Sequence, residues 1–223
     1  MAMPDGWLHT RVPETDADML VAYPTVPGRE QSAARLDRSL WLQDGPPVDT
    51  LRMSGYATCG EAWNDAAAWA AASGYRYLVL AADDLEAAQG AAQAARVALE
   101  DGWAPSAFIA RACPAADCED TVESHGDWGR AYEGEGAVAV SMTRIPALRV
   151  EWWRPIPPIH YWSDNAVTAV LRALAVPVLA SRRFAWRHHW ASEGRISGVG
   201  EQANRERETY VEFERALVAG GVS

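Results

Sequence analysis

The chain has 223 residues, of which 49% are hydrophobic and 22% are charged, a composition typical of a folded globular protein that can bury a core of its own. Its formal net charge of −10 argues against nonspecific binding to nucleic acid or to an anionic membrane surface. All 20 basic residues are arginines, which excludes lysine Schiff bases and a P-loop lysine.

The cysteines and the hydrophobic pattern indicate the compartment. The three cysteines, Cys59, Cys113 and Cys118, are an odd number in a chain whose amino terminus does not look like a signal peptide. The longest apolar runs are far shorter than a membrane span. We therefore expect a cytoplasmic protein with reduced thiols and no membrane span.

The first part of the chain alternates strands and helices. Residues 1–17 show no periodicity, and we expect them to form a loose leader. Hydrophobic periodicity then predicts strands at 19–23, 48–53 and 77–82, with helices at 31–42 and 61–73 between them. Thr58 and Glu61 have the spacing of a capping box, and Gly74 stands where a helix C-cap glycine belongs. Short connections in this order are typical of a mainly parallel sheet.

The second part of the chain continues the pattern less regularly. The expected elements are a helix at 87–101, strands at 107–112, 138–142, 148–153 and 177–180, an acidic surface loop at 113–136, a helix after 163–165 and a helix at 205–217. No repeat or linker divides the sequence. We expect one α/β domain over residues 1–223, with a mainly parallel central sheet flanked by helices and a carboxyl-terminal helix within 200–223.

The most informative stretch is a buried strand that ends in acidic residues. The apolar run 77–82 is followed at once by Asp83 and Asp84, and then by Glu86. Ligands bind at the carboxyl edge of the sheet in open α/β folds. Carboxylates this close repel each other unless they are neutralised, and a divalent cation is the usual solution. The alternative is an ordinary polar turn after a strand.

The motifs together resemble a family of enzymes. The strand and turn Ala22–Arg29, the helix sequence Ala62–Asn64 and the strand end Ala82–Asp84 are similar to GT-A-fold glycosyltransferases, and more narrowly to small family-2-like members, including forms carried by actinobacterial phages. The resemblance covers about residues 18–190. It implies a single GT-A-like (Rossmann-like) domain that transfers a sugar from a nucleotide sugar, with Mn²⁺ or Mg²⁺ as cofactor.

The resemblance also assigns metal ligands. The family's Asp-x-Asp motif places its last aspartate on Asp84, while the first falls on Ala82. Asp84 is the expected metal ligand, and His188 is a second one, for which packing against neighbouring tryptophans is the alternative. The departure at Ala82 leaves open whether Asp83 makes the sugar or ribose contact, and whether Asp84 works together with Glu86.

Further residues are assigned to the substrates and to catalysis. The substrate-binding candidates are Tyr23 and Thr25 at the base, Arg29 near them, Asn64 and Asp83 towards the donor, Arg187 as a phosphate clamp and Trp162 on the acceptor side. Asp164 matches the position of the base that deprotonates the acceptor hydroxyl in inverting members. A helix N-cap, for which Ser163 competes, is the alternative role of Asp164.

The leading hypothesis is therefore metal-dependent, inverting glycosyl transfer. The expected partners are a nucleotide sugar, with a UDP-sugar as the first choice, and an acceptor carbohydrate or glycosylated protein, in the host cytoplasm if the protein is encoded by a phage. One alternative is a non-catalytic binding or structural protein on a degenerate GT-A fold, which Ala82 favours. Another is a sugar nucleotidyltransferase, which the glycine-poor turn at 26–29 disfavours.

Overall fold

The structure is a computed structural model. It describes the chain in segments, and all statements about it refer to these residues: 5–10, 17–45, 47–100, 107–114, 128–130, 144–176, 178–181, 186–189 and 199–220. The predicted strand at 138–142 and most of the predicted loop at 113–136 lie outside them.

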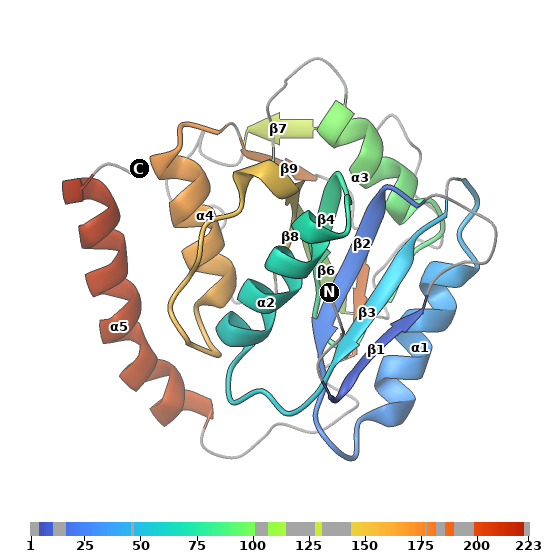
Figure 1. Cartoon of the computed structure of the whole chain (residues 1–223), viewed down its shortest axis with the longest axis horizontal. Coiled ribbons are helices and arrows are strands. Elements are labelled where there is room, and N and C mark those ends of the chain that lie inside the picture. Colours follow the sequence, from blue (N-terminus) through green and yellow to red (C-terminus); the bar gives the residue numbers. More distant parts are fainter. Residues whose placement is uncertain are drawn as a thin grey trace.

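The described residues form a mixed α/β arrangement in which a sheet is flanked by helices (Figure 1). The strands are β1 (Trp7–Thr10), β2 (Met19–Pro24), β3 (Asp49–Met53), β4 (Tyr77–Leu80), β5 (Leu85–Ala87), β6 (Ala107–Pro114), β7 (Trp128–Arg130), β8 (Arg144–Arg149), β9 (Val178–Ser181) and β10 (Trp186–His188). The helices are α1 (Glu30–Trp41), α2 (Cys59–Ala72), α3 (Ala91–Glu100), α4 (Ser163–Ala173) and α5 (Val199–Gly220), with a short 3₁₀ turn, η2, at Val150–Trp152.

The sheet is mixed, so the prediction of a mainly parallel sheet was wrong. The strand order is β1-β3-β2-β4-β8-β6-β10-β5, with β9 on β6 and β7 on β9. The parallel pairs are β2–β3, β2–β4, β6–β9 and β6–β10, and the antiparallel pairs are β1–β3, β4–β8, β6–β8, β5–β10 and β7–β9. The strand–helix periodicity correctly predicts parallel pairing of β2, β3 and β4. It carries no information about β8, which enters between β4 and β6 in the opposite direction.

Strand β2 shows why the sheet is buried on both faces. Met19, Val21 and Tyr23 pack on one face with α1 and α3, while Leu20 and Ala22 pack on the other with α2 and α4. All five side chains are buried, as expected for a central strand that reads as a continuous apolar run. The two crossovers from β2 to β3 and from β3 to β4 lead in opposite directions along the sheet, which places α1 and α2 on opposite faces.

Local signals explain where α2 begins and ends. The Thr58 hydroxyl accepts a hydrogen bond from the Glu61 backbone N–H, and the Glu61 carboxylate accepts one from the Thr58 N–H, each at 3.2 Å. This is the predicted capping box. Beyond the carboxyl end, Gly74 has a φ of +82°, a left-handed conformation that costs glycine little, which confirms the predicted helix stop.

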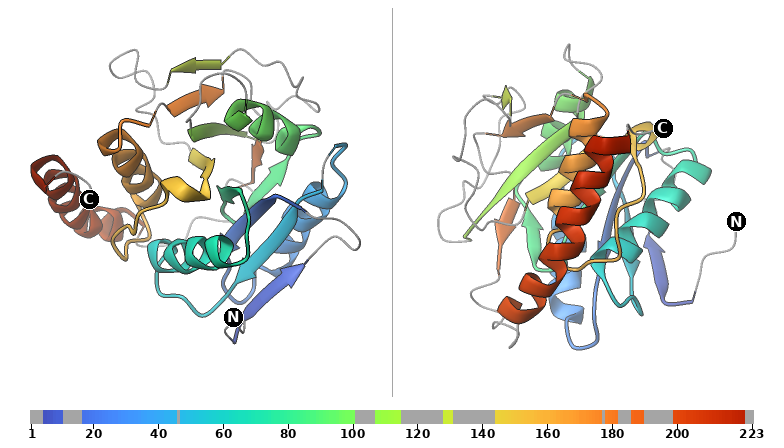
Figure 2. Two further views of the ribbon diagram at one scale, coloured as in Figure 1. Left: turned by 45° about the horizontal axis from the view of Figure 1, so that its top comes forward. Right: turned by 90° about the vertical axis from the view of Figure 1, so that its left-hand side faces the viewer.

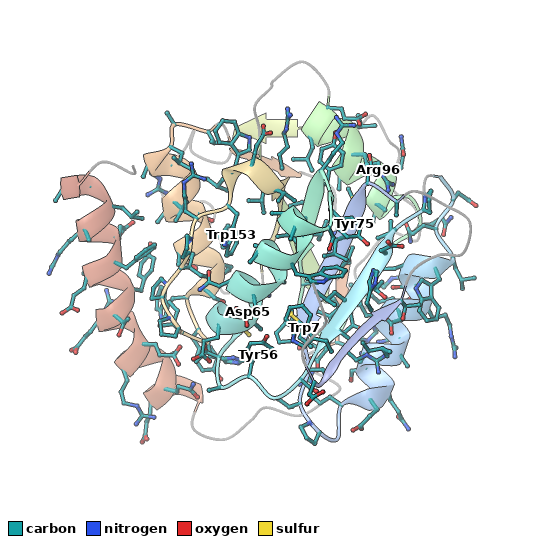
Figure 3. The ribbon with its side chains drawn as sticks, viewed as in Figure 1. Trp7, Tyr56, Asp65, Tyr75, Arg96 and Trp153 are labelled. Carbon is teal, nitrogen blue, oxygen red and sulfur yellow. The ribbon has the colours of Figure 1, made fainter. Side chains whose placement is uncertain are left out.

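The leader was predicted to be loose, but part of it forms β1. This strand pairs antiparallel with β3 at the edge of the sheet. Trp7 Nε1 donates to the Tyr56 hydroxyl at 3.0 Å, and that hydroxyl donates to Asp65 at 2.8 Å, which ties β1 to α2 (Figure 3). His9 Nε2 also lies 3.0 Å from the Tyr75 hydroxyl. These partners are distant in sequence, so the leader alone contains no signal for them.

Two other predicted elements differ from the structure. The helix expected at 87–101 begins only at Ala91, because residues 85–87 form β5 and Gly90 turns the chain with a φ of +82°. The strand expected at 148–153 ends at Arg149 and continues as η2. In both places, pairing with distant strands decides the boundary.

The carboxyl-terminal helix α5 lies alongside α4 on the outside of the molecule, in red beside orange in Figures 1 and 2. Tyr210, Phe213 and Leu217 of α5 pack against the apolar cluster on the α2–α4 face of the sheet. These three residues are the face that helical spacing predicts.

Candidate functional site

The centre of the candidate site is the point where the strand order reverses. From β2 the chain continues to β3 on one side, and it then crosses to β4 on the other side of β2. The carboxyl ends of the parallel strands β2 and β4 are therefore neighbours at one edge of the sheet. Such a switch point is where open α/β sheets bind ligands.

Four side chains from two loops meet at this switch point. The Thr25 hydroxyl donates to Asp83 Oδ2 at 2.8 Å. Arg29 Nη2 lies 3.0 Å from Asp83 Oδ1 and 3.5 Å from Asp84 Oδ2. The guanidinium thus bridges two carboxylates that would otherwise repel each other. Asp83 is only 7% exposed, so a buried charge at this position requires these partners. The structure thus brings together four of the predicted site residues.

The β5–β10 pair extends the site on the side of Asp84. The Asp84 carbonyl accepts a hydrogen bond from the His189 N–H at 2.9 Å. Glu86 Oε1 lies 3.0 Å from Arg187 Nη1, and Glu86 Oε2 lies 2.8 Å from His189 Nε2. Arg187, a predicted phosphate clamp, is therefore held by Glu86, two residues after Asp84 in the chain. The prediction named His188. The structure describes the backbone of His188, opposite Leu85 in β5.

Tyr23 lies in the core and not at the surface of the site. Its side chain is 0% exposed. Its hydroxyl donates to Asp37 Oδ1 at 2.6 Å, and Arg52 Nε donates to that hydroxyl at 3.2 Å. Burial, followed by the hydrogen bond to Asp37, raises the pKa of Tyr23 well above its ordinary value. This residue anchors α1 and β3 to β2. Its hydroxyl is bound to Asp37 and Arg52, and no part of the side chain is exposed to a ligand.

Asn64 is bound to the backbone of a neighbouring segment. Its Nδ2 donates to the Ile156 carbonyl at 2.8 Å, and its Oδ1 accepts from the Ile156 N–H at 2.9 Å. Both ends of the amide are used, so the side chain fastens the 155–158 segment to α2. Its place in the structure is that of a scaffold residue.

Asp164 is in the first turn of α4, as predicted, and Trp162 directly precedes this helix. Asp164 Oδ1 accepts a hydrogen bond from the Asn165 N–H at 2.8 Å, so this carboxylate binds a backbone donor of its own first turn. Trp162 stands at the N-cap position with a φ of +72°. Its indole stacks on Tyr210, with ring centroids 5.6 Å apart. The side chain of Trp162 is therefore partly covered by α5.

A cysteine and a histidine from distant parts of the chain meet at the start of α2. Cys59, the first residue of α2, has its sulfur 3.2 Å from His160 Nδ1. Burial raises the pKa of the Cys59 thiol to about 12, and the carboxylates of Asp83, Asp164, Glu206 and Asp84 add to this shift. The contact between Cys59 and His160 joins the start of α2 to the segment just before α4, the helix in which Asp164 lies.

Sequence reasoning missed His160, Glu206 and the role of Cys59. The capping box marked the start of α2, where Cys59 lies. His160 is 101 residues away from Cys59 in sequence. The sequence contains no signal for Glu206, because glutamates are common on the solvent-facing side of helices. The acidic region is also a poor setting for a nucleophilic cysteine, since such thiols need a lowered pKa.

Within the described segments, a metal ion would need ligands from a bound substrate in addition to protein side chains. No group of three or more histidine, cysteine, aspartate or glutamate side chains within the described segments is arranged to hold a metal ion. Magnesium-type sites, however, use one or two carboxylates together with substrate phosphates. Asp84, beside Asp83 at the switch point, supplies carboxylate oxygens of the type that such cations prefer.

Comparison with known proteins leaves the function to be argued from the structure. No protein family model matches the chain, and no curated protein matches it significantly. In the part of the chain that the structure describes, no helix combines the length and the apolar character needed to cross a membrane.

Proposed function

We propose that the protein is a glycosyltransferase that binds a nucleotide sugar at the carboxyl ends of β2 and β4 and transfers the sugar to an acceptor hydroxyl. The observation that carries the proposal is the cluster of Thr25, Arg29, Asp83 and Asp84 at the switch point. This cluster supplies a guanidinium group, two carboxylates and a hydroxyl at the place where open α/β sheets bind their ligands.

The donor half of the site consists of the β2–α1 loop, the end of β4 and β10. Arg29 and Arg187 present guanidinium groups, which recognise phosphate oxygens by paired hydrogen bonds. Asp84, with Asp83 beside it, would hold Mn²⁺ or Mg²⁺. When bound, such a cation neutralises the charge of the departing nucleoside diphosphate. Asp83 is bound by Thr25 and Arg29, so its first role in this proposal is to fix the geometry of the pair.

The acceptor half consists of the starts of α2 and α4. Asp164 would accept the proton of the acceptor hydroxyl as that oxygen attacks the sugar. Asp164 follows His160 by four residues, and the His160 ring contacts, at 3.2 Å, the Cys59 sulfur at the start of α2. Direct attack by an acceptor at this position corresponds to inversion. A carbohydrate or a glycosylated protein is the acceptor class that we propose, with a UDP-sugar as donor.

A non-catalytic binding protein is the second candidate. Two observations favour it: Arg29 already neutralises the acidic pair, and Asp164 already binds the Asn165 N–H. In such a protein these charges would stabilise the loops and the ligand would not react. The experiment below separates the two candidates.

The test combines ligand binding with product release. Purified protein is heated with UDP-, GDP-, dTDP- and CMP-sugars, with Mn²⁺ or with a chelator, and release of the nucleoside diphosphate is measured in parallel. A ligand at about a hundred times its dissociation constant adds about 2.7 kcal/mol of stability. The transferase proposal expects a cation-dependent shift with one nucleotide and release of that diphosphate. It also expects both to be lost in Asp84→Asn and kept in Asp44→Asn, which changes an exposed aspartate.

Each other outcome has a defined meaning. Binding without diphosphate release in the presence of carbohydrate acceptors supports the non-catalytic candidate. Equal behaviour of Asp84→Asn and wild type contradicts the placement of the site. Failure of every nucleotide to shift the melting temperature contradicts the proposed function.

A further inference from the structure

Helix α5 binds the turn at residues 160–162, which we call the 160–162 turn. Glu206 Oε2 accepts hydrogen bonds from two successive backbone N–H groups, those of His160 at 2.9 Å and Tyr161 at 2.6 Å. Trp162 Nε1 donates to the Ala203 carbonyl at 2.9 Å. A carboxylate that receives consecutive backbone amides forms charge-assisted bonds, which are shorter and stronger than neutral ones.

The turn needs this support because its backbone is strained. Trp162 has a φ of +72°, in the left-handed region that a bulky side chain rarely adopts. Such conformations persist only where surrounding contacts enforce them. Here the contacts come from α5: the two amides bound by Glu206, and the stacking of Trp162 on Tyr210. Gln202 orients the other oxygen of Glu206, since its Nε2 donates to Oε1 at 2.8 Å.

The 160–162 turn lies directly before α4 and also contacts the start of α2, the two elements of the acceptor half. His160 at its start contacts the sulfur of Cys59 at 3.2 Å, and its carbonyl accepts the Ser163 hydroxyl at 3.1 Å. Asp164 follows in the first turn of α4. In the donor half, Arg29, after β2, lies 3.0 Å from Asp83 and 3.5 Å from Asp84, after β4.

We propose that Glu206 is a positioning residue for the acceptor half of the site. By binding the amides of His160 and Tyr161, it fixes the 160–162 turn, and through it the positions of His160 and Asp164 relative to the donor half. The structural part of this proposal stands by itself, while its catalytic consequence rests on the proposed glycosyl transfer.

The first test measures the turn without any activity. Glu206→Gln removes the charge while keeping the shape of the side chain, and Glu208→Gln, which changes an exposed glutamate of α5, is the matched control. The rate at which iodoacetamide labels Cys59 is followed by peptide mass spectrometry, which separates this thiol from the other two.

We expect Cys59 to be labelled at least about threefold faster in Glu206→Gln than in wild type, because His160 is released and a negative charge is lost near the thiol. Glu208→Gln should label at the wild-type rate. Equal rates in all three proteins would overturn the proposal. Equal acceleration in both variants would overturn it as well, because the effect would then be a general loosening of α5.

The second test separates the two halves of the site. With the nucleotide sugar identified by its thermal shift, Glu206→Gln should lower kcat for transfer about tenfold or more, while the KM for the donor and the thermal shift stay unchanged. A fall in donor affinity with unchanged kcat would overturn the assignment to the acceptor half. If wild type itself transfers no sugar, the proposed function fails, and the Cys59 labelling still decides the role of Glu206.

Discussion

The Thr25 hydroxyl donates a hydrogen bond to Asp83 Oδ2 at 2.8 Å, between residues that are 58 positions apart in the sequence. This bond joins the loop after β2 to the turn after β4. With Arg29 on Oδ1, both oxygens of the Asp83 carboxylate are bound by protein groups. The two adjacent aspartates therefore differ: Asp83 organises the strand ends, and Asp84 lies nearer to the β5–β10 side.

The first prediction tests the bond between Thr25 and Asp83. Thr25→Val keeps the shape of the side chain but removes the hydroxyl, so Asp83 Oδ2 loses this hydrogen-bond donor in a buried position. We expect a loss of about 1–3 kcal/mol in the free energy of unfolding, measured by urea denaturation. Thr25→Ser retains the hydroxyl and should lose less. If Thr25→Val were as stable as wild type, this hydrogen bond would not stabilise the contact between the two loops.

The second prediction concerns the charge balance of Asp83 and Asp84. Arg29→Gln removes the guanidinium that bridges the two carboxylates, so the variant should be less stable than wild type in the presence of a chelator. Mn²⁺ should then raise its melting temperature more than it raises that of wild type, because the cation replaces the missing charge. Arg38→Gln, which changes an exposed arginine of α1, is the control.

An equal response of Arg29→Gln and wild type to Mn²⁺ would contradict this prediction. It would mean that the carboxylates do not take up a cation even when their arginine is gone. The comparison uses melting temperature only, so it is independent of catalysis.

Parts of the fold that depend on local patterns were predictable from the sequence. The capping box at Thr58 and Glu61 and the stop at Gly74 each lie within a few residues of the helix they delimit. The apolar run before Asp83 also placed the acidic pair at a strand end. These features depend on neighbours in sequence, where hydrophobic periodicity and capping signals apply.

Features that depend on distant partners were not predictable in the same way. The residues of β1 read as a leader because the strand is defined by its pairing with β3. Tyr23 looked like a surface candidate at a strand end, but its hydroxyl is bound within the core to Asp37, 14 residues away. The contact of Cys59 with His160 likewise joins residues whose separation in sequence carries no periodic signal.

The third prediction tests the close approach between α2 and the 155–159 segment. A Cβ at Gly60 would lie 2.2 Å from the Pro157 carbonyl oxygen, which is a backbone atom and cannot move aside cheaply. The Gly60 N–H also donates to the Ile159 carbonyl at 2.9 Å. We expect Gly60→Ala to lower the free energy of unfolding by about 1–3 kcal/mol or more, because overpacking forces the backbone to shift.

The matched control for Gly60→Ala is Gly200→Ala. Gly200 is in α5 and has no atom within 4 Å of the added Cβ, so this variant should be neutral or more stable, by up to about 1 kcal/mol. Thermal and urea unfolding of both variants give the comparison. Similar stability of the two variants would contradict the close packing at Gly60.

The fourth prediction uses the pKa of Cys59, which burial and the nearby carboxylates raise to about 12. In the unfolded chain the thiol ionises at its ordinary pKa of about 8.5. Above that pH the unfolded chain has lost the thiol proton that the folded protein still binds. Stability from this group is therefore fully present below about pH 8.5 and is lost as the pH rises towards 12.

Cys59→Ala removes this contribution, so its free energy of unfolding should fall less steeply between about pH 8.5 and 10 than that of wild type. The difference in slope should approach about 1 kcal/mol per pH unit, and the other two cysteines contribute equally to both proteins. Urea denaturation at several pH values measures it. Parallel pH profiles of the two proteins would contradict this prediction, because they would show that the pKa of the Cys59 thiol is not raised in the folded protein.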